Sequence, residues 1–278
     1  MSEIAGRTVL ITGGASGVGR RVALRIAALG GQVVLWDINQ DALERTLAEV
    51  TRAGGGRAAA GHLCDIADRE NVYATAERVR REVGAVDILI NNAGIVSGKH
   101  FLDLPDGQIE ATFKINALAL FWTAKAFLPG MIERNRGHIV TMGSASGYIG
   151  VAKLSDYAAS KWAAVGFDES LRVELRRRAP GVMTTIVCPY YIDTGMFRGV
   201  RTRFALLLPI LDEQVVADRI VRAIRRNQRR LVMPRLVGFV PLMRMLPVPL
   251  FDAVATFLGV NASMDDFVGR DSGRRTAT

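Results

Sequence analysis

Cysteine, histidine and lysine are scarce in this chain of 278 residues, which contains two, three and five of them respectively. Both cysteines, Cys64 and Cys188, lie in apolar runs and cannot build a disulfide framework. Neither they nor the scattered histidines have the spacing of metal ligands. We therefore expect no metal site and a reduced, intracellular protein, most simply a cytoplasmic one.

Long uninterrupted apolar segments are also missing. The first seven residues lead directly into a strand-like run without a signal segment, so we expect neither secretion nor an amino-terminal membrane anchor. The late apolar stretch, residues 236–260, is broken by Arg244, Asp252 and three prolines. It contains no run of the ~20 residues that a spanning helix needs, so we expect it not to be transmembrane.

Acidic residues are scarce in one segment. Of the net charge of +9, residues 198–244 carry +8, from eleven arginines and three acids. No nucleic-acid motif or aromatic-interleaved basic strip accompanies these arginines, so we do not expect nucleic-acid binding. Next to the apolar stretch, the arginines are compatible with a lid over a lipophilic substrate, a subunit contact or a peripheral membrane contact. The lid and the subunit contact are favoured over the membrane.

What the chain does contain is a regular alternation of apolar strands and amphipathic helices. Such alternation predicts a parallel sheet covered on both faces, here a single Rossmann-type, doubly wound α/β domain. Strands are expected at residues 7–12, 32–37, 57–64, 86–91, 138–142, 183–188 and 230–234, with helices that include 68–82, 105–134 and 212–228. The expected units are a catalytic domain at 1–235 with a substrate loop at 190–211, an apolar extension at 236–267 and a disordered tail at 268–278.

A glycine-rich turn joins the first strand to the first helix. Gly13, Gly17 and Gly19 follow the strand directly, and the helical pattern begins without a spacer. Glycines let the backbone approach a pyrophosphate closely, and the helix amino terminus offers unpaired N–H groups. The turn therefore predicts a dinucleotide site.

The second strand ends in Asp37, 18 residues after Gly19. A carboxylate at this place accepts hydrogen bonds from the adenosine ribose and repels the 2′-phosphate of NADP. We therefore expect NAD to be preferred over NADP. Two alternatives stay open: Arg20 and Arg21 can partly compensate a phosphate, and Asp37 can cap the helix that follows.

Tyr157 and Lys161 are four residues apart, so on a helix their side chains share one face. A fixed cation near a phenol lowers the phenol pKa from ~10 and favours the phenolate. Such a tyrosine can take a proton from an alcohol or return one to a carbonyl. A Tyr–Lys pair at this spacing is usually a coincidence of helical geometry, and its meaning depends on the other motifs.

Together these motifs resemble the short-chain dehydrogenase/reductase family over about residues 5–195. The glycine turn from Thr12 to Gly19, the strand-four motif 91–94 and the spacing of Ser144 before Tyr157 all match the family in order. The resemblance implies an oxidoreductase whose catalytic residues are Asn116, Ser144, Tyr157 and Lys161. It implies cofactor contacts at Gly13, Ser16, Gly17, Val18, Gly19, Asp37, Asp65, Ile66, Asn92, Ala93, Gly94, Tyr157, Lys161, Pro189 and Thr194.

The resemblance also implies a role for each catalytic residue. Tyr157 is the general base, and Lys161 depresses its pKa and binds the nicotinamide ribose. Ser144 holds the substrate oxygen, a role for which Ser146 competes by residue type. Asn116 orders a water that links Lys161 to solvent.

Three further segments, 35–39, 121–129 and 137–140, are similar to the branch that contains 17β-hydroxysteroid and retinol dehydrogenases. This branch implies a lipophilic secondary or long-chain alcohol or carbonyl, and a homodimer or homotetramer. Its eukaryotic members carry an amino-terminal anchor that is not expected here. The chain departs from the family at Tyr190, where glycine is usual. The expected substrate pocket consists of Ser144, Tyr148, Leu154, Tyr190 and Tyr191, with Phe197 beside them.

Two other functions remain open from the sequence. One is an NADPH-dependent carbonyl reductase, from which Asp37 discriminates. The other is a nucleotide-binding scaffold or redox sensor without turnover, against which the intact Ser144, Tyr157 and Lys161 set argues.

Overall fold

The computed structural model describes residues 3–56 and 59–269. Its strands form one seven-stranded parallel sheet in the order β3-β2-β1-β4-β5-β6-β7. The order reverses direction after β1, so the predicted doubly wound α/β fold is confirmed. The strands are β1 Thr8–Thr12, β2 Gln32–Asp37, β3 Ala60–Leu63, β4 Ile88–Asn91, β5 Gly137–Met142, β6 Val182–Pro189 and β7 Arg230–Met233.

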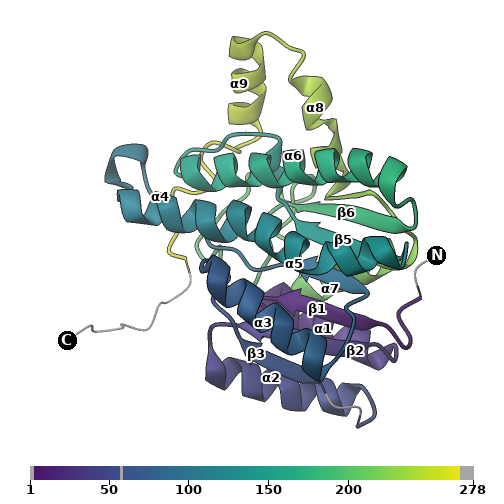
Figure 1. Ribbon diagram of the computed structural model, residues 1–278. Helices are drawn as coiled ribbons and strands as arrows, with labels where there is room; N and C mark the ends of the chain where they lie inside the picture. Colours follow the sequence, from purple (N-terminus) through teal and green to yellow (C-terminus); the bar gives the residue numbers. More distant parts are fainter. Residues whose placement is uncertain (1–2, 57–58, 270–278) are drawn as a thin grey trace.

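The helices cover both faces of this sheet (Figure 1). Successive strand residues point to opposite faces, so Val9 packs with α1 and α7, whereas Leu10 packs with α3 and α5. Every residue of β1 and β4 is buried, as a centrally placed parallel strand requires. The helices are α1 Gly17–Ala28, α2 Gln40–Ala53, α3 Arg69–Glu82, α4 Asp106–Phe113, α5 Ala119–Glu133, α6 Ser155–Arg178, α7 Glu213–Arg225, α8 Val240–Met243 and α9 Val248–Phe257.

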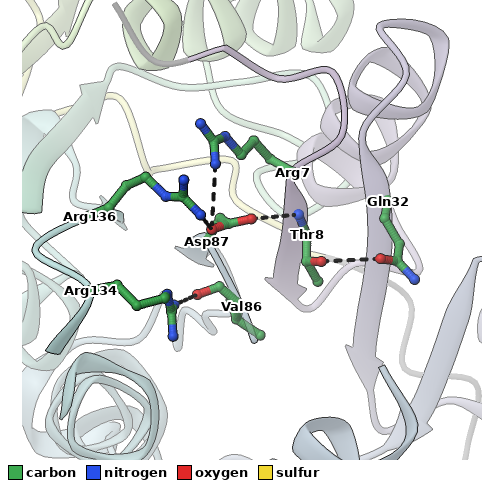
Figure 2. Close-up of polar contacts among 7 residues, drawn as sticks. All are labelled: Arg7, Thr8, Gln32, Val86, Asp87, Arg134 and Arg136. Carbon is green, nitrogen blue, oxygen red and sulfur yellow. Dashed lines mark hydrogen bonds and ion pairs between the residues drawn. The ribbon is translucent and has the colours of Figure 1, made fainter. Parts of the chain in front are cut away.

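The amino-terminal edge of the sheet is held by Asp87, which lies just before β4 (Figure 2). Its carboxylate accepts a hydrogen bond from the Thr8 N–H at 3.2 Å and pairs with Arg7 and Arg136. Thr8 also donates its hydroxyl hydrogen to Gln32 Oε1 at 3.1 Å. These contacts connect β1, β2, β4 and β5 at the amino-terminal ends of the strands. The glycine turn lies at the opposite, carboxyl-terminal ends.

Several expected boundaries differ from the structure. The helix expected at 105–134 is interrupted, because residues Lys114–Leu118 form a π-helical turn between α4 and α5. The third strand begins at Ala60 rather than 57, and residues 57 and 58 lie outside the described residues. Most of the tail expected at 268–278, namely residues 270–278, also lies outside the described residues. Val268 and Gly269 are described, and both backbone N–H groups donate to the Arg198 carbonyl.

One helical segment, Asp106–Glu133, is long and apolar enough to cross a membrane by length and composition. Half of its most apolar window is buried in the protein. Core helices of water-soluble proteins pass the same test, and α5 packs here against α3 and the sheet. In the late segment, α9 is apolar but has only ten residues, fewer than a span requires.

Candidate active site

A cleft runs along the carboxyl ends of β1, β2, β4, β5 and β6. Ligands of open α/β sheets bind at this edge, where the strand order reverses. The cleft is lined by every residue expected to contact the cofactor except Gly19. Its two ends differ in chemistry: one has the carboxylates of Asp37 and Asp65, and the other has Ser144, Tyr157 and Lys161.

The glycine turn shapes the first wall of the cleft. Gly13 has a φ of +60°, and a Cβ there would lie 2.9 Å from the Ala93 Cα. A Cβ on Gly19 would lie 2.4 Å from the Gly13 carbonyl oxygen. Gly19 therefore acts behind the wall, where it lets α1 start directly against the turn. Only glycine permits this close packing of the turn against α1 and the end of β4.

Polar contacts hold this turn against the end of β4. Asn92 donates its side-chain amide to the carbonyls of Thr12 and Gly13, both at 3.0 Å. The Thr12 hydroxyl accepts the N–H groups of Asn92 and Ala93. The amino terminus of α1 lines the cleft beside this turn. The Ser16 side chain makes no capping hydrogen bond to the backbone N–H groups of α1. The first N–H groups of α1 are thus placed to bind a pyrophosphate.

Asp37 lies at the far end of the cleft, fixed by the backbone around it. Its Oδ2 accepts the Ala15 N–H at 3.0 Å and its Oδ1 accepts the Asn39 N–H at 3.1 Å. Asn39, and not Asp37, caps α2, because its side chain accepts the Ala42 N–H. The capping alternative for Asp37 is therefore wrong. Asp65, beside it in the cleft, accepts the Ala67 N–H at 2.9 Å.

The two arginines at the start of α1 are engaged elsewhere. Arg20 pairs with Glu49 of α2, and Arg21 donates to Glu213 of α7 at 2.6 Å. Among the described residues that line the cleft, Lys161 is the one cation, and it lies at the end away from Asp37. The Asp37 end therefore presents negative charge without a cation for a 2′-phosphate.

At the opposite end, α6 presents Tyr157 and Lys161 on one face, and both side chains are buried. The Lys161 ammonium donates to the Met142 carbonyl at 2.8 Å and lies 5.6 Å from the Tyr157 ring centroid. Burial raises the pKa of Tyr157 to about 12, although the Ser144 hydroxyl opposes part of this rise. Burial likewise lowers the pKa of Lys161 to about 8.

The expectation that Lys161 depresses the pKa of Tyr157 is thus not met by the protein alone. The reason is that the low-dielectric interior disfavours the phenolate and the ammonium alike. In addition, the ammonium is directed at a backbone carbonyl. A further positive charge in the cleft would favour the phenolate and lower the pKa of Tyr157.

Asn116 lies in the π-helical turn and is 1% exposed. Its amide donates to the Ile95 carbonyl at 2.9 Å and to the Ser160 hydroxyl at 3.0 Å, and its oxygen accepts the Ile95 N–H. The side chain is thus fully engaged, and Asn116 is not among the residues that line the cleft. It holds the Gly94–Ile95 segment beside Lys161, because a Cβ on Gly94 would lie 3.1 Å from Asn116 Oδ1 and 3.6 Å from Lys161 Nζ.

A second, apolar cavity adjoins the reactive end of the cleft. Ser144, Tyr190 and Phe197 line both spaces, so these residues form the boundary between them. Ser146 lines the apolar cavity but not the cleft, and its backbone N–H donates to the Ser144 hydroxyl. Ser144 is therefore the hydroxyl positioned toward Tyr157. The remaining lining is apolar and comes largely from the late segment, including Leu236, Val240, Met243, Phe251, Ala255 and Leu258.

Of the expected pocket residues, Ser144, Tyr190 and Tyr191 line this cavity, as does Phe197. Tyr148 and Leu154 do not. The Tyr148 hydroxyl accepts the Cys188 thiol at 3.5 Å behind the cavity wall, and Leu154 is completely buried in a cluster with Tyr157. Both side chains belong to the core that supports the site. Proximity to the catalytic residues in sequence does not distinguish core residues from pocket residues.

Aromatic rings connect the boundary residues to Tyr157. The Phe197 ring meets the Tyr157 ring edge-on, with centroids 5.8 Å apart, and meets Tyr191 at 5.1 Å. Tyr190 contacts Tyr191 at 4.5 Å, and the Tyr191 hydroxyl shares a hydrogen bond with Ser263. Tyr190 thus places an aromatic wall where the family pattern has glycine.

Comparison with known proteins agrees with this geometry. The short chain dehydrogenase family profile matches residues 7–204. Mouse epidermal retinol dehydrogenase 2 is 47% identical over 270 residues, which are 96% of this chain and 87% of that protein. A Burkholderia phymatum short chain dehydrogenase/reductase in complex with NAD has a TM-score of 0.79 and 27% identity, over 88% of this chain and 95% of that one. A metagenomic short-chain oxidoreductase in complex with NADP has a TM-score of 0.69 and 27% identity, over 83% and 96%.

Proposed function

Because the chain belongs to the short-chain dehydrogenase family, and is accordingly an oxidoreductase, we propose that it interconverts a lipophilic alcohol and its carbonyl with NAD(H). The observation that carries this proposal is the position of Ser144, which lines both the cleft that contains Tyr157 and Lys161 and the adjoining apolar cavity. The similarity to a retinol dehydrogenase supports a retinoid, a steroid or a long-chain alcohol as the substrate class.

The residues of the cleft fit a nicotinamide dinucleotide. Gly13, Gly17 and the α1 amino terminus would hold the pyrophosphate, Asp37 the adenosine ribose, and Lys161 the nicotinamide ribose. When bound in its oxidised form, the cofactor supplies a hydride acceptor and a positive charge at the reactive end. NAD is favoured over NADP because Asp37 carries a negative charge and Arg20 and Arg21, at the start of α1, are paired elsewhere.

In the direction of alcohol oxidation, Tyr157 accepts the hydroxyl proton of the substrate. A positive charge near the phenol lowers its pKa, which burial otherwise raises to about 12. Ser144 donates a hydrogen bond to the substrate oxygen and sets its position beside Tyr157. General acid–base catalysis of this kind contributes roughly 10²- to 10⁴-fold. Asn116 acts as a positioning residue, because it holds the Gly94–Ile95 wall next to Lys161.

An absorbance assay of nicotinamide reduction tests this function. The full chain is mixed with NAD or with NADP and a panel of retinoids, sterols, long-chain alcohols and short secondary alcohols. We expect turnover of lipophilic alcohols with NAD. Preference for NADPH and carbonyl reduction would favour the carbonyl-reductase alternative. The absence of even a single turnover with any substrate would favour a nucleotide-binding scaffold.

We also propose that the protein forms a homodimer or homotetramer. In support, large apolar side chains are exposed along α5 and α6, including Phe121, Trp162 and Val173. Light scattering of the purified chain tests the oligomeric state. A monomer at micromolar concentration would contradict it.

A further inference from the structure

Helices α8 and α9 project away from the rest of the molecule, beyond the β7 edge of the sheet (Figure 1). We call residues 240–257 the hairpin. Its inner side chains, such as Met243 and Phe251, line the apolar cavity next to Ser144. Most of its exposed side chains are also apolar, among them Leu242, Met245 and Val248, whereas Arg244, Asp252 and Thr256 are the exposed polar ones. An exposed apolar helix face is normally buried in protein or in lipid.

The tip of the hairpin is the most exposed part of this surface. Residues 245–250 are all exposed, and none of the six carries a charge. Met245 is 81% exposed and Val248 is 71% exposed. Contiguous exposed apolar surface of this kind marks an interaction site in soluble proteins.

A second apolar segment extends this surface. The ring of Phe204 packs on Phe257 at the end of α9 with centroids 5.6 Å apart, and Arg203 donates to the Phe257 carbonyl at 3.2 Å. Leu206 and Leu207, which follow in the same loop, are 99% and 51% exposed. The loop 203–211 and the hairpin therefore present their apolar side chains near one another.

The positive charges of this region lie behind the tip. Arg235 is exposed just before the hairpin, and Arg203 sits over the Phe204 and Phe257 rings at the end of α9. Arg244 follows α8, and its guanidinium is directed back to the Tyr148 carbonyl and the Trp162 ring. Between residues 235 and 260, Asp252 is the one acid in the sequence. An apolar tip backed by arginines complements the acyl and phosphate layers of an anionic bilayer.

We propose that the hairpin inserts its tip into the surface of an anionic lipid bilayer, and that a lipophilic alcohol passes from the lipid between α8 and α9 into the apolar cavity. The docking stands on the hairpin alone, whereas the passage of substrate rests on the proposed function. A second copy of the chain fits this surface less well. A standard protein interface needs roughly 800 Å² of complementary face per partner, while a fluid bilayer closes around a narrow projection. In this proposal the hairpin is a lid, one of the two roles that the sequence favoured, and also the peripheral membrane contact that the sequence did not favour.

Flotation of the full chain with vesicles tests the docking. The vesicles contain phosphatidylcholine with a fraction of phosphatidylserine, and the expected result is that the wild-type chain floats with them. The double substitution Met245→Glu and Val248→Glu should lower the partition constant by about tenfold or more per residue, because each apolar side chain leaves the lipid. The matched control is Leu102→Glu, which places the same charge at an exposed leucine outside both cavities and should float like the wild type.

Two substrates separate the docking from the chemistry. A long-chain alcohol is embedded in the vesicles and a short secondary alcohol is dissolved in water, each with NAD. The double variant should lose activity on the embedded alcohol and keep it on the soluble one. If neither alcohol is oxidised but the wild type floats, the proposed function fails and the docking stands. The docking is overturned if the wild type does not float, or if the double variant floats equally well. A vesicle-free change from dimer to monomer in the double variant, without flotation of the wild type, would assign the surface to a second copy and also overturn it.

Discussion

The ammonium of Lys161 donates to the carbonyl oxygen of Met142, at the end of β5, at a distance of 2.8 Å. This bond fixes the buried cation beside the strand end, 5.6 Å from the Tyr157 ring centroid. Lys161 therefore contributes its charge as part of the cleft wall, where we propose that the cofactor ribose binds. Burial raises the pKa of Tyr157 to about 12 and lowers that of Lys161 to about 8, so a positive charge bound in the cleft would favour the phenolate.

Removing the Tyr157 hydroxyl should strongly lower turnover without disturbing the cleft. We expect Tyr157→Phe to lower kcat by at least about 10²-fold, because the ring stays in its apolar cluster while the proton acceptor is lost. NAD binding, measured by fluorescence titration, should survive. Tyr148→Phe is the matched control, since that hydroxyl lies behind the cavity and contacts Cys188. Substantial activity in Tyr157→Phe would refute the assignment of the base.

The cofactor preference should follow the charge at the end of β2. Asp37→Asn removes the charge and keeps an acceptor for the Ala15 N–H, so we expect the NADP-to-NAD ratio of kcat/KM to rise about tenfold, equivalent to roughly 1.4 kcal/mol. Adding Glu49→Gln should raise the ratio further, because this releases Arg20 from its ion pair. Glu49→Gln alone tests whether the arginine acts without loss of the Asp37 charge. A wild-type enzyme that already prefers NADP would contradict this interpretation.

Tyr190 should set the fit of long substrates. We expect Tyr190→Ala to raise KM for a long-chain alcohol by about tenfold, the effect of losing one apolar wall of a pocket. A short secondary alcohol should be affected much less, because it does not reach past Ser144. Steady-state kinetics with both alcohols measure the difference. Equal losses on the two substrates would mean that Tyr190 supports the backbone over the cofactor instead.

The buried carboxyl of Asp168 on α6 predicts a pH-dependent stability. Burial raises its pKa to about 6, and the Thr184 hydroxyl and Arg172 oppose only part of this rise. A carboxyl whose folded pKa is raised binds its proton more tightly in the folded state, so stability falls as pH rises through that pKa. Between pH 5 and pH 8, the free energy of unfolding of the wild type should decrease by about 1 kcal/mol relative to Asp168→Asn. Urea unfolding at both pH values measures this change, and a constant difference would show that Asp168 stays charged or is hydrated.

Local features of the sequence determined much of the fold and of the cofactor cleft. Apolar strands alternating with helices require a parallel sheet covered on both faces, and the turn from Gly13 to Gly19 requires close backbone contacts. Because strand ends of a parallel sheet meet at one edge, residues as distant in sequence as Asp37 and Thr194 were predictable parts of one cleft. The spacing of Tyr157 and Lys161 on one helix placed them on one face for the same reason of regular geometry.

Tertiary packing decided which partners the individual side chains contact, because the regular geometry of helices and strands does not specify them. Whether Arg20 faces a phosphate or Glu49 depends on how α1 packs on α2, and Lys161 binds Met142 because β5 ends beside α6. The sequence predicted Tyr148 in the pocket, but this side chain packs in a core cluster with Cys188 of β6, whose thiol donates to the Tyr148 hydroxyl. Most of all, residues 240–257 were only an apolar stretch in sequence. Their packing turned one side toward Ser144 and left the other uncovered, since burial of a helix face depends on partners far away in the chain.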